Sequence, residues 1–221
     1  MNVSPDVKSA QGTSQPLKKG RNIIAVASGK GGVGKTWFSV TLTHAFAQHG
    51  QRALLFDADL GLANVDIQLG LMPQRDLGGV ISGRITLAQA KIHCPDGNFD
   101  VLAGRSGSGT LAALPPSRLA RLGTDLVHLS DDYDQVIMDL GAGIDRTVRG
   151  LSSRAGQIIV VTTTEPTSLT DAYAFIKITI LANPAADIRL VVNNCANHAE
   201  GRRTFDTLRK ACESFLKYTP P

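Results

Sequence analysis

Short apolar runs alternate with amphipathic stretches from residue 22 onward. Six runs are rich in Val, Ile and Leu and are typical of strands buried on both faces: Asn22–Ala27, Arg52–Asp57, Phe99–Gly104, Asp134–Asp139, Gln157–Thr162 and Asp187–Asn193. Four longer stretches repeat apolar residues every three or four positions and predict helices: Lys35–His49, Pro116–Ser130, Ser168–Leu181 and Arg202–Lys217. This alternation predicts an α/β fold, a mostly parallel sheet with helices on both faces. Functional residues are then expected at the carboxyl ends of the strands.

Two segments fall outside this pattern. Residues 1–20 are rich in Ser, Gln, Lys and Pro and lack apolar periodicity, so we expect a flexible leader followed by one domain over residues 21–221. Residues 104–116, GRSGSGTLAALPP, predict a long surface loop. The glycines of this loop are not followed by Lys-Ser or Lys-Thr, which argues against a phosphate site there.

Composition excludes several classes of protein. The chain has 221 residues, 43% of them hydrophobic and 19% charged, which is enough apolar material for a core and excludes wholesale disorder. No apolar run reaches the roughly 20 residues that cross a bilayer, and no signal segment opens the chain, so we expect a cytoplasmic protein. Three widely spaced cysteines predict neither a disulfide framework nor a zinc site. Part of the net charge of +4 lies in the leader, so no specific nucleic-acid partner is expected.

A phosphate-binding motif follows the first apolar run. Residues 28–36 read SGKGGVGKT, in which Gly29, Gly34, Lys35 and Thr36 satisfy G-x-x-x-x-G-K-[ST] between a strand and a helix. The glycines let backbone N–H groups surround phosphates, Lys35 adds positive charge and Thr36 offers an oxygen to Mg²⁺. The motif therefore predicts a bound nucleoside triphosphate.

Three carboxylates stand at the ends of predicted strands. Asp139 ends one strand and fits the acidic residue that holds Mg²⁺ in nucleotide triphosphatases of this type. Asp57 and Asp59 end another, two residues apart and so on the same side of an extended chain. We expect all three to approach the phosphate loop.

Lys30 gives the loop the form K-G-G-V-G-K-T, which resembles the deviant Walker A motif of the MinD/ParA family of ATPases. Three longer strings are similar to one group within that family, the flagellar-number regulators of the FlhG (FleN/YlxH) type. These strings are DADLGLANVDIQLGL (Asp57–Leu71), YDQVIMDLGAGI (Tyr133–Ile144) and TTTEPTSLTDAYAFIK (Thr162–Lys177).

The resemblance implies a P-loop NTPase fold and a role for each site residue. The nucleotide would be bound by Gly29, Lys30, Gly31, Gly32, Val33, Gly34, Lys35 and Thr36, with Asn193 contacting the adenine. Lys30, Lys35 and Asp59 would be catalytic, and Asp59 would orient the attacking water. Thr36 would ligate Mg²⁺, with Asp57 supporting the metal shell and Asp139 forming the second switch with Gly141.

The function implied is that of an Mg²⁺-dependent ATPase that forms a homodimer on binding ATP, because Lys30 would reach the nucleotide of the other subunit. Such a protein would regulate the number or position of flagella, with the FlhF GTPase or basal-body and regulator proteins as further partners. The leader lacks the Asp-Gln-Ala-x-x-Leu segment by which many regulators of this type engage FlhF. The alternative is a nucleotide-dependent binding module that positions a septum, a plasmid or other cargo with little hydrolysis.

The resemblance also bears on the C-terminus. Relatives of this type usually continue with a further strand and helix and a membrane-targeting helix, so we expect the C-terminal part of the fold to be truncated here. The last predicted helix carries Phe205, Leu208, Cys212, Phe215 and Leu216 on one face, which we expect to pack on the sheet. A peripheral position at the inner face of the membrane is the alternative for that helix.

Overall fold

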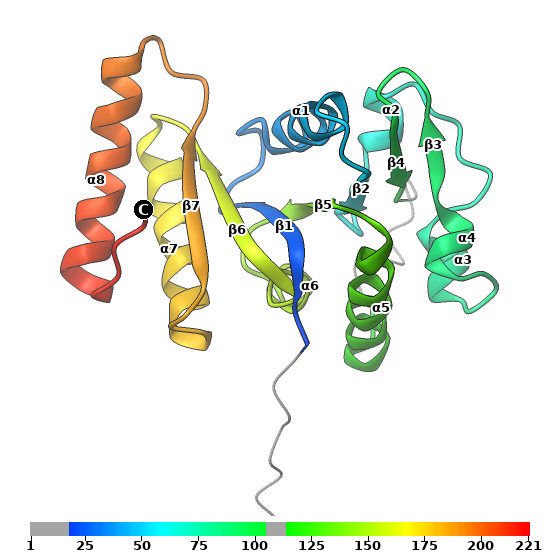
Figure 1. Cartoon of the computed structure of the whole chain (residues 1–221). Coiled ribbons are helices and arrows are strands. Elements are labelled where there is room, and N and C mark those ends of the chain that lie inside the picture. The colour runs from blue at the N-terminus through cyan, green and yellow to red at the C-terminus, as the bar shows by residue number, and fades with distance from the viewer. Residues whose placement is uncertain (1–17, 105–113) are drawn as a thin grey trace, which may run out of the picture.

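A seven-stranded sheet with the order β3-β4-β2-β5-β1-β6-β7 runs through the middle of the protein (Figure 1). The computed structural model describes residues 18–104 and 114–221. The strands are β1 (Gly20–Ser28), β2 (Ala53–Ala58), β3 (Ile92–Cys94), β4 (Phe99–Leu102), β5 (Gln135–Ala142), β6 (Ala155–Thr162) and β7 (Asp187–Val192). Neighbouring strands are parallel except for β3, which pairs antiparallel with β4 at one edge. The α/β fold and all six predicted strands are confirmed.

The helices are α1 (Lys35–Gln48), α2 (Val65–Gln68), α3 (Leu77–Ile81), α4 (Leu87–Ala90), α5 (Pro116–Leu129), α6 (Arg146–Ser152), α7 (Pro166–Ala182) and α8 (His198–Leu216), with a 3₁₀ turn at Ser130–Asp132. Four of them match the predicted helices. The α8 helix begins four residues earlier than predicted because the side chain of Asn197 accepts a hydrogen bond from the Glu200 N–H, at 3.0 Å, and caps it.

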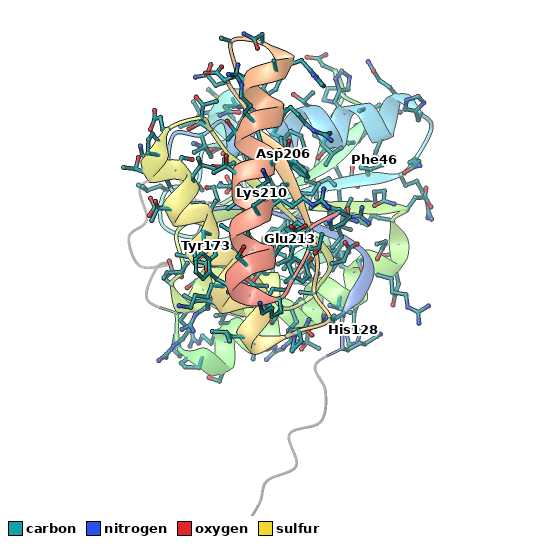
Figure 2. The ribbon with its side chains drawn as sticks, turned by 90° about the vertical axis from the view of Figure 1, so that its left-hand side faces the viewer. Phe46, His128, Tyr173, Asp206, Lys210 and Glu213 are labelled. Atoms are coloured by element: carbon teal, nitrogen blue, oxygen red, sulfur yellow. The ribbon has the colours of Figure 1, made fainter. Side chains whose placement is uncertain are left out.

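Helices cover both faces of the sheet. In Figure 1 the α1 helix lies on one face and α5, α6 and α7 lie on the other, and Figure 2 shows Phe46 of α1 and His128 of α5 on opposite sides. The inner strand β2 is buried along its whole length because both of its faces are covered. Among the described helices, none is both long and apolar enough to cross a membrane.

Besides the start of α8, the sequence-based predictions differ from the structure at the start of the first strand and on the apolar face of the last helix. The first strand begins at Gly20, one residue inside the predicted leader, and its N–H donates to the carbonyl of Arg154 at 3.0 Å. Residues 1–17 and 105–113, which hold the rest of the leader and most of the predicted surface loop, lie outside the described residues. The predicted apolar face of α8 is wrong at Phe215, which is 78% exposed.

The buried face of α8 consists of Thr204, Leu208 and Cys212, spaced four residues apart. In place of Phe215, the side chain of Tyr218 returns to the sheet, and its Oη accepts a hydrogen bond from the Ile188 N–H at 3.1 Å. The sheet is therefore covered by a residue that follows the helix.

Candidate functional site

The phosphate loop connects β1 to α1, and its backbone is shaped by two glycines. Gly34 has a φ of +86°, a conformation that L side chains rarely adopt, and a β-carbon there would lie 2.3 Å from Nδ2 of Asn193. A β-carbon at Gly29 would lie 2.2 Å from the backbone of Asp171 in α7. At Gly31 and Gly32 a β-carbon would meet nothing within 4 Å, so the middle of the loop borders open space. The loop is thus fixed at its ends and accessible at its centre.

Asn193 holds this loop from the end of β7. Its Nδ2 donates to the carbonyl of Val33 at 2.9 Å, and its backbone N–H continues the sheet to the carbonyl of Thr162 at 2.8 Å. The structure therefore gives Asn193 a loop-positioning contact that the sequence did not predict. The contact to adenine stays a prediction.

A buried ion pair joins α1 to β5. Nζ of Lys35 lies 3.1 Å from Oδ1 of Asp139, and the two side chains are 9% and 1% exposed. The hydroxyl of Ser39, one helical turn after Lys35, lies 2.9 Å from the same oxygen. The other oxygen, Oδ2 of Asp139, is buried and has no hydrogen-bond partner among the described residues. A buried carboxylate oxygen without a partner costs free energy, so this atom suits a cation or a hydrogen-bond donor.

Asp57 lies beside Asp139, since the two residues are paired in the register of β2 and β5. Its oxygens accept backbone N–H groups from the following loop: Oδ1 from Asp59 at 3.2 Å, and Oδ2 from Asn64 at 3.0 Å and Val65 at 3.1 Å. Burial raises the pKa of Asp57 to about 7, and the neighbouring charge of Asp139 adds to this, while the N–H groups oppose it. Asp57 thus fixes the loop of residues 59–65 next to the site, as a supporting residue would.

Asp59 faces the segment that follows Asp139. A β-carbon at Gly141 would lie 3.4 Å from Oδ1 of Asp59, so the carboxylate rests against the backbone of the second predicted switch. The same oxygen accepts the N–H groups of Gly61 at 3.3 Å and Leu62 at 2.9 Å. The loop after β2 and the predicted second switch are therefore in contact through Asp59.

Thr36 stands in the first turn of α1, where the early N–H groups of a helix have no partner within the helix and attract anions. The described residues contain no group of three or more His, Cys, Asp and Glu side chains that could hold a metal. Mg²⁺ commonly binds through one or two protein oxygens together with phosphate oxygens and water. The unpaired Oδ2 of Asp139 and the hydroxyl of Thr36 fit that mode of binding, with a triphosphate completing the shell.

Lys30 has partners within its own chain. Its Nζ lies 2.6 Å from Oε2 of Glu165 and 3.2 Å from Oγ1 of Thr167, at the start of α7. The side chains of Lys30 and Glu165 are 40% and 62% exposed, so water weakens their pairing. Lys30 is therefore held at the surface of the loop by a contact that is easily exchanged.

An open depression of about 580 Å³ lies at the carboxyl end of β7 and the start of α8. Asn193, His198, Arg202 and Phe205 are among its lining residues. The planar side chains of His198, Arg202 and Phe205 and the amide of Asn193 suit a heterocyclic base. Asn193 both lines this depression and contacts the phosphate loop.

The structure brings together the predicted phosphate loop, the three aspartates and Asn193 at the carboxyl ends of the parallel strands. Sequence reasoning missed Ser39, Glu165 and Thr167. Ser39 follows Lys35 by four residues and so lies on the same helix face, a spacing that could have found it. Glu165 carried no comparable signal, because its partner is 135 residues away in the sequence.

Comparisons with known proteins find similar sequences and similar solved structures. The sequence profile of the CobQ/CobB/MinD/ParA nucleotide binding domain matches residues 24–218. Antiactivator FleN of Pseudomonas aeruginosa is 41% identical over 194 residues, which cover 88% of this chain and 69% of that protein. The flagellum site-determining protein YlxH of Helicobacter pylori is 30% identical, over 89% of this chain and 66% of its own length. The structure of the septum site-determining protein MinD complexed with Mg-ADP from Pyrococcus horikoshii has a TM-score of 0.72 and 26% identity, covering 84% of this chain and 76% of that one.

Proposed function

Because this chain belongs to the CobQ/CobB/MinD/ParA nucleotide-binding domain family, we propose that it is an Mg²⁺-dependent ATPase that dimerises on binding ATP and regulates the number or position of flagella. The observation that carries the ATPase proposal is the pairing of Lys35 with one oxygen of Asp139 while the other oxygen is buried without a partner in the described residues. The flagellar role is drawn from the names of the relatives FleN and YlxH.

The phosphate groups of ATP would occupy the open centre of the loop. Backbone N–H groups of residues 30–36 and the positive end of α1 would receive the phosphate oxygens, and Lys35 would exchange part of its contact with Asp139 for one to phosphate. Mg²⁺ supplies charge neutralisation between the outer phosphates when bound. Thr36 and Oδ2 of Asp139 would hold it, the latter through water, and Asp57 would keep the adjoining loop in place.

Hydrolysis needs a water molecule placed in line with the outer phosphate. Asp59 is the side chain suited to orient it, because its carboxylate lies at the contact between the loop after β2 and the segment at Gly141. Phosphoryl transfer asks little covalent help of a protein, so placement and charge supply most of the rate. Slow hydrolysis suits a molecular switch in which the ATP-bound and ADP-bound proteins make different contacts.

The dimerisation proposal rests on Lys30. Its Nζ is bound to exposed partners, so moving it onto a phosphate in a second subunit costs little. Adenosine diphosphate lacks the outermost phosphate and would give Lys30 a weaker partner, so ATP would favour the dimer.

The test of the ATPase proposal is phosphate release from Mg-ATP by the whole chain, which EDTA should prevent. Asp59→Asn keeps an oxygen that can accept the N–H groups of Gly61 and Leu62 but removes the charge. We expect this variant to hydrolyse ATP at least about a hundred-fold more slowly, while binding a fluorescent ATP analogue as well as the parent does. Equal phosphate release by the two proteins would contradict the assignment of Asp59. Binding without phosphate release by the parent itself would favour a nucleotide-dependent binding module.

A further inference from the structure

A groove of about 700 Å³ lies between the α3–α4 segment and α5. Figure 1 shows α5 on the face of the sheet opposite α1. None of its lining residues belongs to the phosphate loop, the three aspartates or the depression at β7. The groove is large enough for several side chains of a partner. It is therefore a second concave surface, independent of the proposed nucleotide site.

The floor of the groove is apolar. Val80 and Ile85 come from the α3–α4 side and Leu122 from α5, and all three pack into the hydrophobic core while also lining the groove. Val80 and Ile85 are only partly buried, so apolar surface remains available to a partner. Apolar side chains entering from outside would gain free energy by covering it.

The rim of the groove is positively charged. Arg84 comes from the turn between α3 and α4, and Arg118 and Arg121 come from α5. One carboxylate, Asp125, lines the groove with them, and its Oδ2 lies 3.7 Å from Nε of Arg121, which is 84% exposed. His128 completes the ionisable lining at the end of α5. The charges on the rim are thus unequal, with three guanidinium groups against one carboxylate.

Two of these arginines bind only neutral oxygens among the described residues. Nη1 of Arg118 donates to the carbonyl of Ile81 at 3.2 Å, reaching across from α5 to the end of α3. Nε of Arg84 donates to the hydroxyl of Ser82 at 3.0 Å. A guanidinium has five N–H donors and can bind a carboxylate through two parallel hydrogen bonds. The described residues use few of the donors of these two side chains, which leaves the others for a carboxylate.

We propose that this groove binds an acidic amphipathic peptide segment of a partner protein, with its apolar side chains on the floor and its carboxylates on Arg84, Arg118 and Arg121. The concave apolar floor favours this occupant over a nucleic-acid duplex, which would need a phosphate-spaced basic surface and offers no apolar side chains. It also disfavours a flat anionic membrane surface, which cannot enter a groove. An amphipathic segment laid in a groove is a common mode of peptide recognition.

The probe is a fluorescein-labelled helical peptide with leucines on one face and glutamates elsewhere, and binding to the whole chain is followed by fluorescence anisotropy without nucleotide. We expect saturable binding, weakened roughly ten-fold or more by the Arg118→Glu, Arg121→Glu double variant. Replacing the leucines of the peptide by serines is expected to abolish binding. A peptide with lysines in place of the glutamates is expected not to bind.

A matched protein control is the double variant Arg203→Glu, Lys210→Glu, which makes the same charge change on the exposed side of α8. We expect it to bind the leucine–glutamate peptide as the parent does, within about two-fold. Circular dichroism spectra would check that all variants are folded. Equal weakening by both double variants, or no dependence on the leucines, would overturn the proposal. The proposal would also be overturned if the Arg118→Glu, Arg121→Glu variant bound the peptide as the parent does but no longer sedimented with phosphatidylglycerol vesicles.

Discussion

Lys30 illustrates how much depends on a single exposed side chain. Within one chain its ammonium group is satisfied by Glu165 and Thr167 at the start of α7. An exposed pair of this kind is worth no more than about 1 kcal/mol, so the contact orients the lysine without locking it. In the proposed dimer, Lys30 would therefore lose little by exchanging this carboxylate for a phosphate.

We predict that Lys30→Ala leaves ATP binding largely intact but abolishes ATP-dependent dimerisation. The loop would keep Lys35 and its backbone N–H groups for the phosphates, while the side chain proposed to reach the second subunit is gone. Size-exclusion chromatography with light scattering, with Mg-ATP in the buffer, measures the result. Lys210→Ala, an exposed lysine on α8 (Figure 2), is the matched control and should dimerise as the parent does. An unchanged ATP dimer of Lys30→Ala would refute the role of Lys30.

The sequence predicts the parts of the site whose residues lie close together in the chain. The distance between Gly34, Lys35 and Thr36 in the chain is fixed, so their joint role could be inferred from sequence alone. The sequence correctly predicts Asn193 at the carboxyl end of a strand. Its hydrogen bond to the carbonyl of Val33, 160 positions away, depends on the strand order. Strand order is set by packing of the whole sheet and not by local pattern.

The antiparallel strand β3 closes one edge of the sheet, and a small polar cluster joins it to β4 and to Tyr133, which precedes β5. Oη of Tyr133 donates to Oδ2 of Asp100 at 2.7 Å, and Nζ of Lys91 donates to the same hydroxyl at 3.1 Å. His93 joins through Nδ1, 3.0 Å from Oδ1 of Asp100. Burial raises the pKa of Tyr133 to about 12, and its hydrogen bond to Asp100 adds to the rise.

We predict that Tyr133→Phe lowers the free energy of unfolding by about 1 kcal/mol at pH 7, because Asp100 loses a hydrogen bond. The pKa of Tyr133 is higher in the folded state than the value near 10 of an unfolded chain, so the contribution of its hydroxyl is complete below pH 10 and is lost as the pH rises through 12. Urea unfolding at pH 7, 9 and 11 should show the two proteins converging at the highest pH.

Tyr173→Phe is the control for this experiment, because no hydrogen bond of its hydroxyl is found among the described residues. Figure 2 labels Tyr173 on α7, far along the chain from the β3 edge. We expect little change in its free energy of unfolding. A difference between parent and Tyr133→Phe that stays constant from pH 7 to pH 11 would argue against the hydrogen bond to Asp100 as its source.

Strands and helices could be predicted where they carry a clear apolar run or period, which the seven-residue helix α6 does not. Six strands and four long helices carry enough apolar repeats to show a period, whereas α2, α3, α4 and β3 span three to five residues each and show none. The α4 helix owes its start to a capping box, in which Thr86 and Gln89 bond each other's backbone N–H groups. This helix is fixed by its capping box and by packing on α5, neither of which an apolar period reveals.

The proposed site draws together the whole molecule, because its residues come from β1, α1, β2, β5, α7 and β7. A ligand held by all of these elements binds the folded chain and not the unfolded one, so it must raise the stability of the fold as a unit. The effect grows with the logarithm of ligand concentration.

We predict that Mg-ATP at one hundred times its dissociation constant adds about 2.7 kcal/mol to the free energy of unfolding. For a chain of this size that corresponds to a rise in melting temperature of roughly 5–10 °C, measurable by differential scanning fluorimetry. Adding EDTA should remove most of the rise, and Lys35→Ala should show little rise above its own melting temperature. A full rise in Lys35→Ala would place the nucleotide elsewhere on the protein.

The clamps on the phosphate loop have a consequence for the order in which the protein acquires its properties during synthesis. The complete motif is made by residue 36, but the backbone of Asp171 and the amide of Asn193, which press against Gly29 and Gly34, emerge from the ribosome much later. A nascent chain that ends before β7 would contain all residues of the phosphate-binding motif but not Asn193, which contacts the loop. We therefore expect the proposed nucleotide site to form late in translation, once β7 has joined the sheet.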